Sequence, residues 1–207
     1  MSDNLVYEKR TPKRILWSRL VVRGATFFDD DHSALFLGSR GEAAILLDFG
    51  EELVARLRIQ GEAAQGGEIK FFYGESVEEA ERQMDVGINW YHMPRDYFEL
   101  NPGPFDLRSI GRRGFRYLCI RVFGGDASVS GLEVTRENAP LRHTGNFSCS
   151  DSRLNEIWDM CARTVGLCMQ SFYEDGVKRD GLLWLGDFRL EFLTAWHAFG
   201  DDVLSRK

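Results

Sequence analysis

The sequence predicts a mainly β protein: an antiparallel β-sandwich of jelly-roll type in residues 1–140, followed by a helical unit in residues 141–207. The first observation is a series of short strand-like runs, separated by turn residues, from Ile15 to about Arg136. The second is a change after Pro140, where apolar residues recur at steps of three and four. At 207 residues, the chain is long enough to bury a real core as one large domain or two small ones.

The strand prediction is clearest in the stretch around Gly50. Residues 43–49 form a compact apolar run that Gly50 ends, and residues 53–59 end in strict alternation of apolar and polar side chains. Four residues are expected on the buried face of the second run: Leu53, Ala55, Leu57 and Ile59. Further strands are expected at residues 69–73, 97–100, 105–108, 115–122 and 129–134. Residues 1 to about 13 predict a loose arm, and residues 76–84 predict one acidic helical turn.

The helical unit is predicted from two apolar stripes. The first follows a cap at Ser150 or Asp151, and its members are Leu154, Ile157, Trp158, Cys161, Val165, Cys168 and Phe172. The second consists of Phe188, Phe192, Trp196 and Phe199 and stops at Gly200. Asp187 lies where this second helix begins and could serve as its N-cap. Neither stripe has much apolar sequence of its own unit to pack against, so the unit is expected to be unfinished.

The functional prediction rests on residues 173–187, which connect the two helices. Three glycines interrupt any regular pattern there, so a loop is expected. Its charged and indole residues are Glu174, Asp175, Lys178, Arg179, Asp180, Trp184 and Asp187. Carboxylates accept hydrogen bonds from hydroxyls, a guanidinium donates in a fixed fork, and an indole stacks on the apolar face of a pyranose. The segment is therefore either a site for a polar ligand, especially a sugar, or a surface loop with ion pairs.

Glycoside hydrolysis is one chemistry that such a loop could perform. It requires a protonated carboxylic acid at the leaving oxygen and a second carboxylate as base or nucleophile. Asp175, Asp180 and Asp187 could form this cluster if the loop folds back on itself; otherwise each is a solvated acid or a helix cap. Ser171 and Tyr173 have no histidine near them in the sequence, which argues against a Ser-His nucleophile.

Composition and charge argue against several classes of protein. A net charge of −6 disfavours nucleic-acid binding, and no apolar run approaches the roughly 18 residues of a membrane span. The first residues lack a signal-peptide pattern, so a cytoplasmic location is expected. The four cysteines show no CxxC pair, and the four histidines show no metal-binding spacing, so neither a metal nor another cofactor is expected. Cys161 and Cys168 are expected to pack in a core.

Several segments together resemble the bacterial α-L-rhamnosidases. Residues 146–158 resemble the start of the catalytic domain of that family, and residues 168–170 with 175–187 look like its active-site segment. The segments similar to the preceding β-sandwich are Leu47–Gly50, Tyr73–Ser76 and Phe115–Tyr117. The resemblance implies an inverting hydrolase that removes terminal α-L-rhamnose on a six-hairpin (α/α)6 barrel. Residues 141–207 would then be the N-terminal fragment of that barrel.

The resemblance also implies roles for five residues of the loop. Asp175 and Asp187 would hold sugar hydroxyls, Arg179 would bind and orient the sugar, and Trp184 would line the rhamnose pocket. Asp180 falls where the family places its general acid. That acid is more commonly a glutamate, often within Arg-Asp-Glu, whereas this chain has Arg179-Asp180-Gly181. Either Asp180 acts as a shorter acid or the proton donor is absent; the first alternative is favoured here.

The general base of the family lies far downstream in the barrel, whereas only twenty residues follow Asp187. The chain is therefore expected to lack the base and most of the barrel, and to be inactive in isolation. Its expected partners are a rhamnose-containing glycoside and either a second copy or a complementing catalytic-domain chain. One alternative is a non-catalytic carbohydrate-binding sandwich with a helical tail. Its sugar contacts could be Trp90, Tyr91 and Tyr97, although core packing is the favoured role of each. Another is a fragment that dimerises by burying Trp158 and Trp196.

Overall fold

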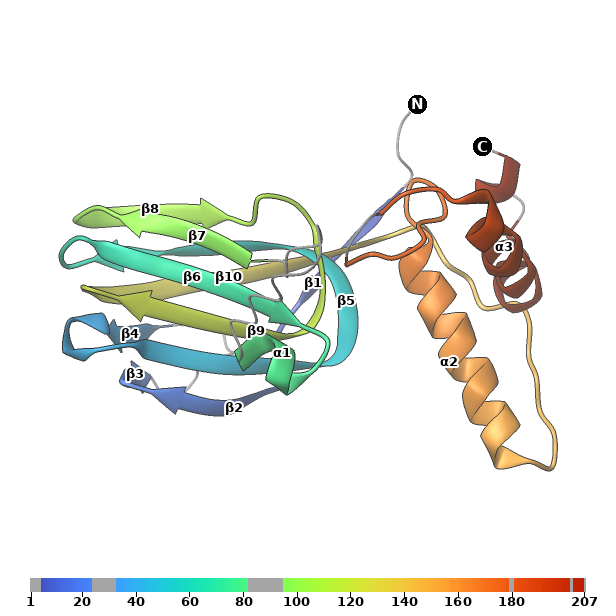
Figure 1. Cartoon of the computed structure of the whole chain (residues 1–207), viewed down its shortest axis with the longest axis horizontal. Helices are drawn as coiled ribbons and strands as arrows, with labels where there is room; N and C mark the ends of the chain where they lie inside the picture. Colours follow the sequence, from blue (N-terminus) through green and yellow to red (C-terminus); the bar gives the residue numbers. More distant parts are fainter. Residues whose placement is uncertain (1–4, 24–32, 82–94, 179–180, 202, 207) are drawn as a thin grey trace. The chain divides into compact units, whose positions relative to one another are not determined.

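The computed structural model describes residues 5–23, 33–81, 95–178, 181–201 and 203–206, and the chain divides into two compact units (Figure 1). The β unit is Glu8–Arg136, and the helical unit combines Met1–Tyr7 with Glu137–Lys207. The boundary falls within two paired strands, β1 (Val6–Arg10) and β10 (Asp126–Asn138). The expected loose arm at the N-terminus is therefore wrong for β1, which is held by backbone pairing.

Antiparallel pairing builds the β unit and confirms the mainly β prediction. Besides β1 and β10, its strands are β2 (Arg14–Arg19), β3 (Val21–Arg23), β4 (Ala34–Leu37), β5 (Ala43–Ala63), β6 (Gly67–Gly74), β7 (Arg95–Leu100), β8 (Gly103–Arg108) and β9 (Arg113–Phe123). Hydrogen bonding orders them β3-β4-β10-β5-β9-β6-β7, with β2 and β8 also on β5. A short 3-10 helix η1 (Gly38–Arg40) and helix α1 (Val77–Glu81) complete the unit, and α1 confirms the acidic turn.

Strand β5 connects most of the β unit. Its first part, residues 43–48, pairs with both β2 and β9, and its second part, residues 55–63, pairs with β10 and along much of its length with β8. The two predicted runs are thus one long curved strand (Figure 1). The β5–β9 register shifts between Asp48 and Leu53, and Gly50 lies there with a φ of +80°, which glycine adopts without strain.

The buried face of β5 agrees with the alternation of the sequence. The four predicted residues are at most 2% exposed: Leu53, Ala55, Leu57 and Ile59. Arg56 between them is exposed. These side chains belong to one large core with the other strands, in which Phe49 meets Phe115 edge to face at 5.5 Å. Burial of this apolar face is the main favourable contribution to the stability of the β unit.

A buried carboxylate marks the bend of β5. Asp48 is 1% exposed and accepts hydrogen bonds from Arg116 Nε (2.9 Å), Arg14 Nε (3.0 Å) and the Gly50 backbone N–H (2.7 Å). The hydrogen bond from Arg116 is the largest of the effects that lower the pKa of Asp48 to about 2, against the opposing effect of burial. The charge of Asp48 therefore ties β2 and β9 to the bend.

Two helices and a short 3-10 helix form the helical unit: α2 (Ser152–Cys168), α3 (Leu185–Phe199) and η2 (Leu204–Arg206). Asp151 caps α2, because its Oδ1 accepts a hydrogen bond from the Arg153 N–H at 2.9 Å. The N-cap of α3 is Trp184, so the expectation that Asp187 caps this helix is wrong; Asp187 lies in the first turn. As predicted, α3 stops at Gly200, which adopts a left-handed conformation.

The buried face of α2 differs from the predicted stripe. Leu154 and Ile157 are 47% and 54% exposed, and Cys161 is also exposed, so its predicted core role is wrong; Cys168 is buried. Phe172 lies beyond the end of α2. Small residues of α2 face the core instead: Ala162 is buried, and a Cβ at Gly166 would lie 3.4 Å from the Phe199 ring.

Both helices expose apolar side chains, as expected from the lack of partners in their own unit. On α3, four large residues are at least 43% exposed: Leu185, Leu190, Leu193 and Trp196. Membership of these helices in an (α/α)6 barrel stays a prediction. None of the described helices is long and apolar enough to cross a membrane.

Candidate active-site loop

The segment after α2 reverses direction at once. The Gln170 N–H donates to the Phe172 carbonyl oxygen at 3.0 Å, and the Glu174 N–H donates to the Cys168 carbonyl oxygen at 3.0 Å. Met169 and Tyr173 form an isolated antiparallel bridge across this turn. The turn therefore fixes Glu174, whose side chain is 1% exposed, against the end of α2.

Asp175 closes the loop that follows. Its backbone N–H donates to the Leu182 carbonyl oxygen at 2.9 Å, and its Oδ1 accepts from the Leu182 N–H at 3.0 Å. Inside this closure, the Gly181 N–H donates to the Gly176 carbonyl oxygen at 3.1 Å, and Gly181 has a φ of +57°. The predicted folding back of the segment is thus present, with Asp175 where the two ends meet.

Tyr173 fastens the loop to α3 and to the segment after it. The side chain is 1% exposed, and its ring packs against Phe188 of the first turn of α3, with centroids 5.4 Å apart. Its hydroxyl donates to Asp201 Oδ2 at 3.0 Å. Burial raises the pKa of Tyr173 well above its usual range, so the phenol stays a neutral donor to this carboxylate.

Three carboxylates of the loop act on a fourth, Glu191 of α3. Glu191 is half-buried on α3, one turn after Asp187. Burial is the largest cause that raises the pKa of Glu191 from 4.5 to about 7, and the negative charges of Asp187, Asp175 and Glu174 raise it further. Two predicted residues, Asp175 and Asp187, are therefore brought together with two acids that the sequence interpretation did not single out as site residues.

The remaining predicted site residues are Trp184, Arg179 and Asp180. Trp184 is 52% exposed at the start of α3, where its indole is available to a ligand. Arg179 and Asp180 lie outside the residues that the structure describes, so their roles stay predictions. No group of three or more His, Cys, Asp or Glu side chains within the described ranges is arranged to hold a metal ion.

Glycoside hydrolases use a pair of carboxylic acids, and an indole can pack on a sugar ring, so several acids and a tryptophan in one segment between two helices are compatible with such a site. Residues 142–206 match the family model of the bacterial alpha-L-rhamnosidase 6 hairpin glycosidase domain. The solved GH78 family rhamnosidase of Bacillus sp. GL1 is similar to 78% of this chain, with 28% identity and a TM-score of 0.66. These matches confirm the resemblance of this chain to the bacterial α-L-rhamnosidases.

Other solved structures support the fold. A rhamnosidase from Klebsiella oxytoca with rhamnose bound matches 99% of this chain at 22% identity and a TM-score of 0.76. An α-L-rhamnosidase from Dictyoglumus thermophilum matches 93% at 20% identity and a TM-score of 0.60. No match was found among curated proteins. The chain spans 17% of the Bacillus enzyme, 43% of the Klebsiella enzyme and 20% of the Dictyoglumus enzyme.

Proposed function

We propose that this chain supplies the acid-bearing loop of an inverting α-L-rhamnosidase that hydrolyses terminal α-L-rhamnosides. The observation that carries the proposal is the convergence of Asp175, Asp187, Glu174 and Glu191 in the segment that matches the rhamnosidase family model. The substrate would be a rhamnose-containing glycoside, held between the carboxylates and the Trp184 indole.

Each proposed role follows from the chemistry of the side chain. Asp175 and Asp187 accept hydrogen bonds from sugar hydroxyls, and Trp184 packs against the apolar face of the ring. Arg179 donates to the sugar, and Asp180 protonates the leaving oxygen. A general acid must keep its proton near the working pH. Beside this loop, burial and the neighbouring carboxylates raise the pKa of Glu191 to about 7, so a protonated carboxyl near neutral pH is available on α3.

The general base is the missing component of this proposal. An inverting enzyme needs a carboxylate roughly 6.5–9.5 Å from the acid, on the opposite face of the sugar. We propose that this carboxylate comes from barrel helices outside these 207 residues, since the matched enzymes are much longer than this chain. The exposed apolar residues of α2 and α3 support the same view, because further helices would cover them.

Hydrolysis of 4-nitrophenyl α-L-rhamnoside tests the proposal. We expect no turnover by the chain alone, and turnover when it is mixed with the barrel segment that follows the matched region in the Bacillus enzyme. Asp180→Asn should abolish that turnover, whereas Asp159→Asn, an exposed acid on α2, should not. Proton NMR should show β-L-rhamnose as the first product. Turnover by the chain alone would contradict the missing base, and α-L-rhamnose as the first product would contradict inversion.

A second candidate function is carbohydrate binding by the β unit without chemistry. It is favoured by Tyr97 of β7, which is 44% exposed and has Lys70 Nζ and Arg95 Cζ each 5.2 Å from its ring centroid. An aromatic ring beside cations suits an acidic sugar. Trp90 and Tyr91 lie outside the described residues. Loss of sugar binding in Tyr97→Ala, with binding retained in Asp187→Asn, would support this function over the first.

A further inference from the structure

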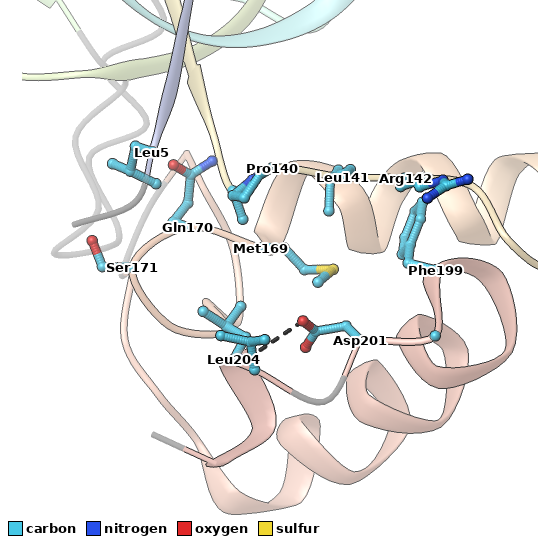
Figure 2. Close-up of a pocket in the computed structure, with 13 residues that line it drawn as sticks. Leu5, Pro140, Leu141, Arg142, Met169, Gln170, Ser171, Phe199, Asp201 and Leu204 are labelled. Carbon is cyan, nitrogen blue, oxygen red and sulfur yellow. Dashed lines mark hydrogen bonds between the residues drawn. The ribbon is translucent and has the colours of Figure 1, made fainter. Parts of the chain in front are cut away.

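The helical unit contains a cavity of about 290 Å³ that is separate from the carboxylate cluster (Figure 2). Its walls come from the segment before α2, the turn after α2 and the residues that follow α3. The apolar side chains in these walls include Leu141, Met169, Phe199 and Leu204. A cavity of this size is at the small end of the range for ligand pockets and fits a single ring or a short chain.

Gln170 gives this cavity a fixed polar group. The side chain is 1% exposed, and its Nε2 donates to the Leu167 carbonyl oxygen at 2.9 Å and to the Glu137 carbonyl oxygen at 3.2 Å. Turning the amide over would place its oxygen against two carbonyl oxygens, so the orientation is determined by these bonds. The Oε1 atom is buried and has no hydrogen-bond partner among the described residues.

The one acid of the cavity wall, Asp201, already accepts hydrogen bonds at both carboxylate oxygens. Asp201 Oδ2 accepts from the Tyr173 hydroxyl, and Oδ1 accepts from the Leu204 N–H at 3.4 Å. Figure 2 shows Asp201 near Leu204, and Gln170 on the opposite side of the cavity close to Pro140 and Leu5. Because a buried acceptor without a donor costs free energy, the unmet requirement of this cavity is one hydrogen-bond donor at Gln170 Oε1.

We propose that this cavity binds a small neutral alcohol or phenol, whose hydroxyl donates to Gln170 Oε1 and whose apolar body contacts Met169, Phe199 and Leu204. A cationic ligand is disfavoured, because Arg142 also lines the cavity and the one carboxylate in its wall, Asp201, already accepts two hydrogen bonds. A carboxylate ligand is disfavoured because it has no proton to donate to Gln170 Oε1. This site is independent of the proposed rhamnosidase activity, which uses residues of the loop.

A matched pair of probes tests the hydroxyl requirement. The full 207-residue chain, labelled with ¹³C at the methionine methyl groups, is titrated with p-cresol and with p-xylene, and the Met169 methyl signal is followed by NMR. The two molecules have nearly the same shape, but p-xylene lacks the hydroxyl and is more apolar. We expect p-cresol to give a saturable shift with an affinity at least about tenfold higher than p-xylene.

Two variants test the location. Ala139→Leu adds carbon atoms to the cavity wall and leaves the Ala139 backbone N–H free to keep its 3.0 Å hydrogen bond to the Met169 carbonyl oxygen. It should abolish p-cresol binding while the far-UV circular dichroism stays unchanged. Leu190→Phe, at a residue 69% exposed on α3, adds apolar atoms outside the cavity and should leave binding unchanged. Three results overturn the proposal: no saturable shift with p-cresol, equal or tighter binding of p-xylene, or unchanged p-cresol binding by a folded Ala139→Leu variant.

Discussion

The carboxylate cluster makes a specific prediction about Glu191→Gln. The folded-state pKa of Glu191 is raised from 4.5 to about 7. Below pH 4.5, the carboxyl is protonated in both the folded and the unfolded chain, so it does not destabilise the fold. Between pH 4.5 and 7, the unfolded chain releases the proton more readily, so the free energy of unfolding falls as the pH rises. Above about pH 7, the free energy of unfolding no longer falls with pH on account of Glu191, because the carboxyl is ionised in both states.

The size of this loss follows from the pKa difference. At about 1.36 kcal/mol for each pKa unit, a rise from 4.5 to about 7 corresponds to at most about 3.4 kcal/mol. Because Glu191 is only half-buried, water screens part of the repulsion, and we expect about 1–2 kcal/mol. Glutamine has nearly the same shape and no charge, so Glu191→Gln should be more stable than the parent chain by this amount at pH 8 and about equal to it at pH 4.

Urea unfolding followed by circular dichroism at 222 nm measures this difference at the two pH values. Glu156→Gln, at an exposed position on α2, is the matched control and should show no such change between pH 4 and pH 8. NMR titration of the Glu191 side-chain carboxyl should give a midpoint near pH 7. The reasoning would be refuted if Glu191→Gln had the same effect at both pH values, or if it destabilised the chain at pH 8.

Three further predictions concern the fold around the sites. Asp48→Asn should destabilise the β unit by about 3 kcal/mol at pH 7, because it removes the buried charge that pairs with Arg116. The difference in free energy of unfolding between the variant and the parent chain should shrink as the pH falls from about 4 toward 2, and acid unfolding curves measure it. Gly50→Ala should lower the free energy of unfolding by about 1–2 kcal/mol, since the φ of +80° is strained for alanine and its Cβ would meet the Lys13 side chain; an unchanged urea midpoint would contradict this. Tyr173→Phe should cost about 1 kcal/mol by removing the hydrogen bond to Asp201, measured by urea unfolding against Tyr97→Phe as an exposed control.

The strands could be predicted from the sequence because alternation determines the face on which each side chain lies. Leu53 and Ile59 are buried as predicted, since both fall on the same face of β5. The continuity of β5 through Gly50 could not be predicted in this way. Glycine is a turn residue in the sequence, but a positive φ at one position also allows a paired strand to bend and continue.

The helical faces show where periodicity is insufficient. The apolar stripe of α2 that includes Leu154 and Ile157 has the correct period, yet these residues are exposed, and the smaller Ala162 and Gly166 face the core. Periodicity identifies a face but not the partner that covers it. Small residues form the contact here because the Phe199 ring approaches the α2 backbone closely.

The site could be predicted in part, because its acids are concentrated in one short segment. Residue type and the family resemblance are enough to predict Asp175 and Asp187. Burial and charged neighbours distinguish Glu174 and Glu191 from other acids, and both depend on how the loop packs on α3, so the sequence does not predict these two residues as site residues. The one sequence signal for Glu191 is its position four residues after Asp187 on a predicted helix, which places the two acids on the same face.

Binding of L-rhamnose to the 207-residue chain tests the central claim most directly. Titration is followed through the indole N–H signal of Trp184 in ¹H–¹⁵N NMR spectra. The account predicts a saturable shift of this signal, an affinity at least about tenfold weaker in Asp187→Asn, and no change in Asp159→Asn. No shift of the Trp184 signal at saturating rhamnose, or the same affinity in Asp187→Asn as in the parent chain, would contradict the claim that this loop recognises rhamnose.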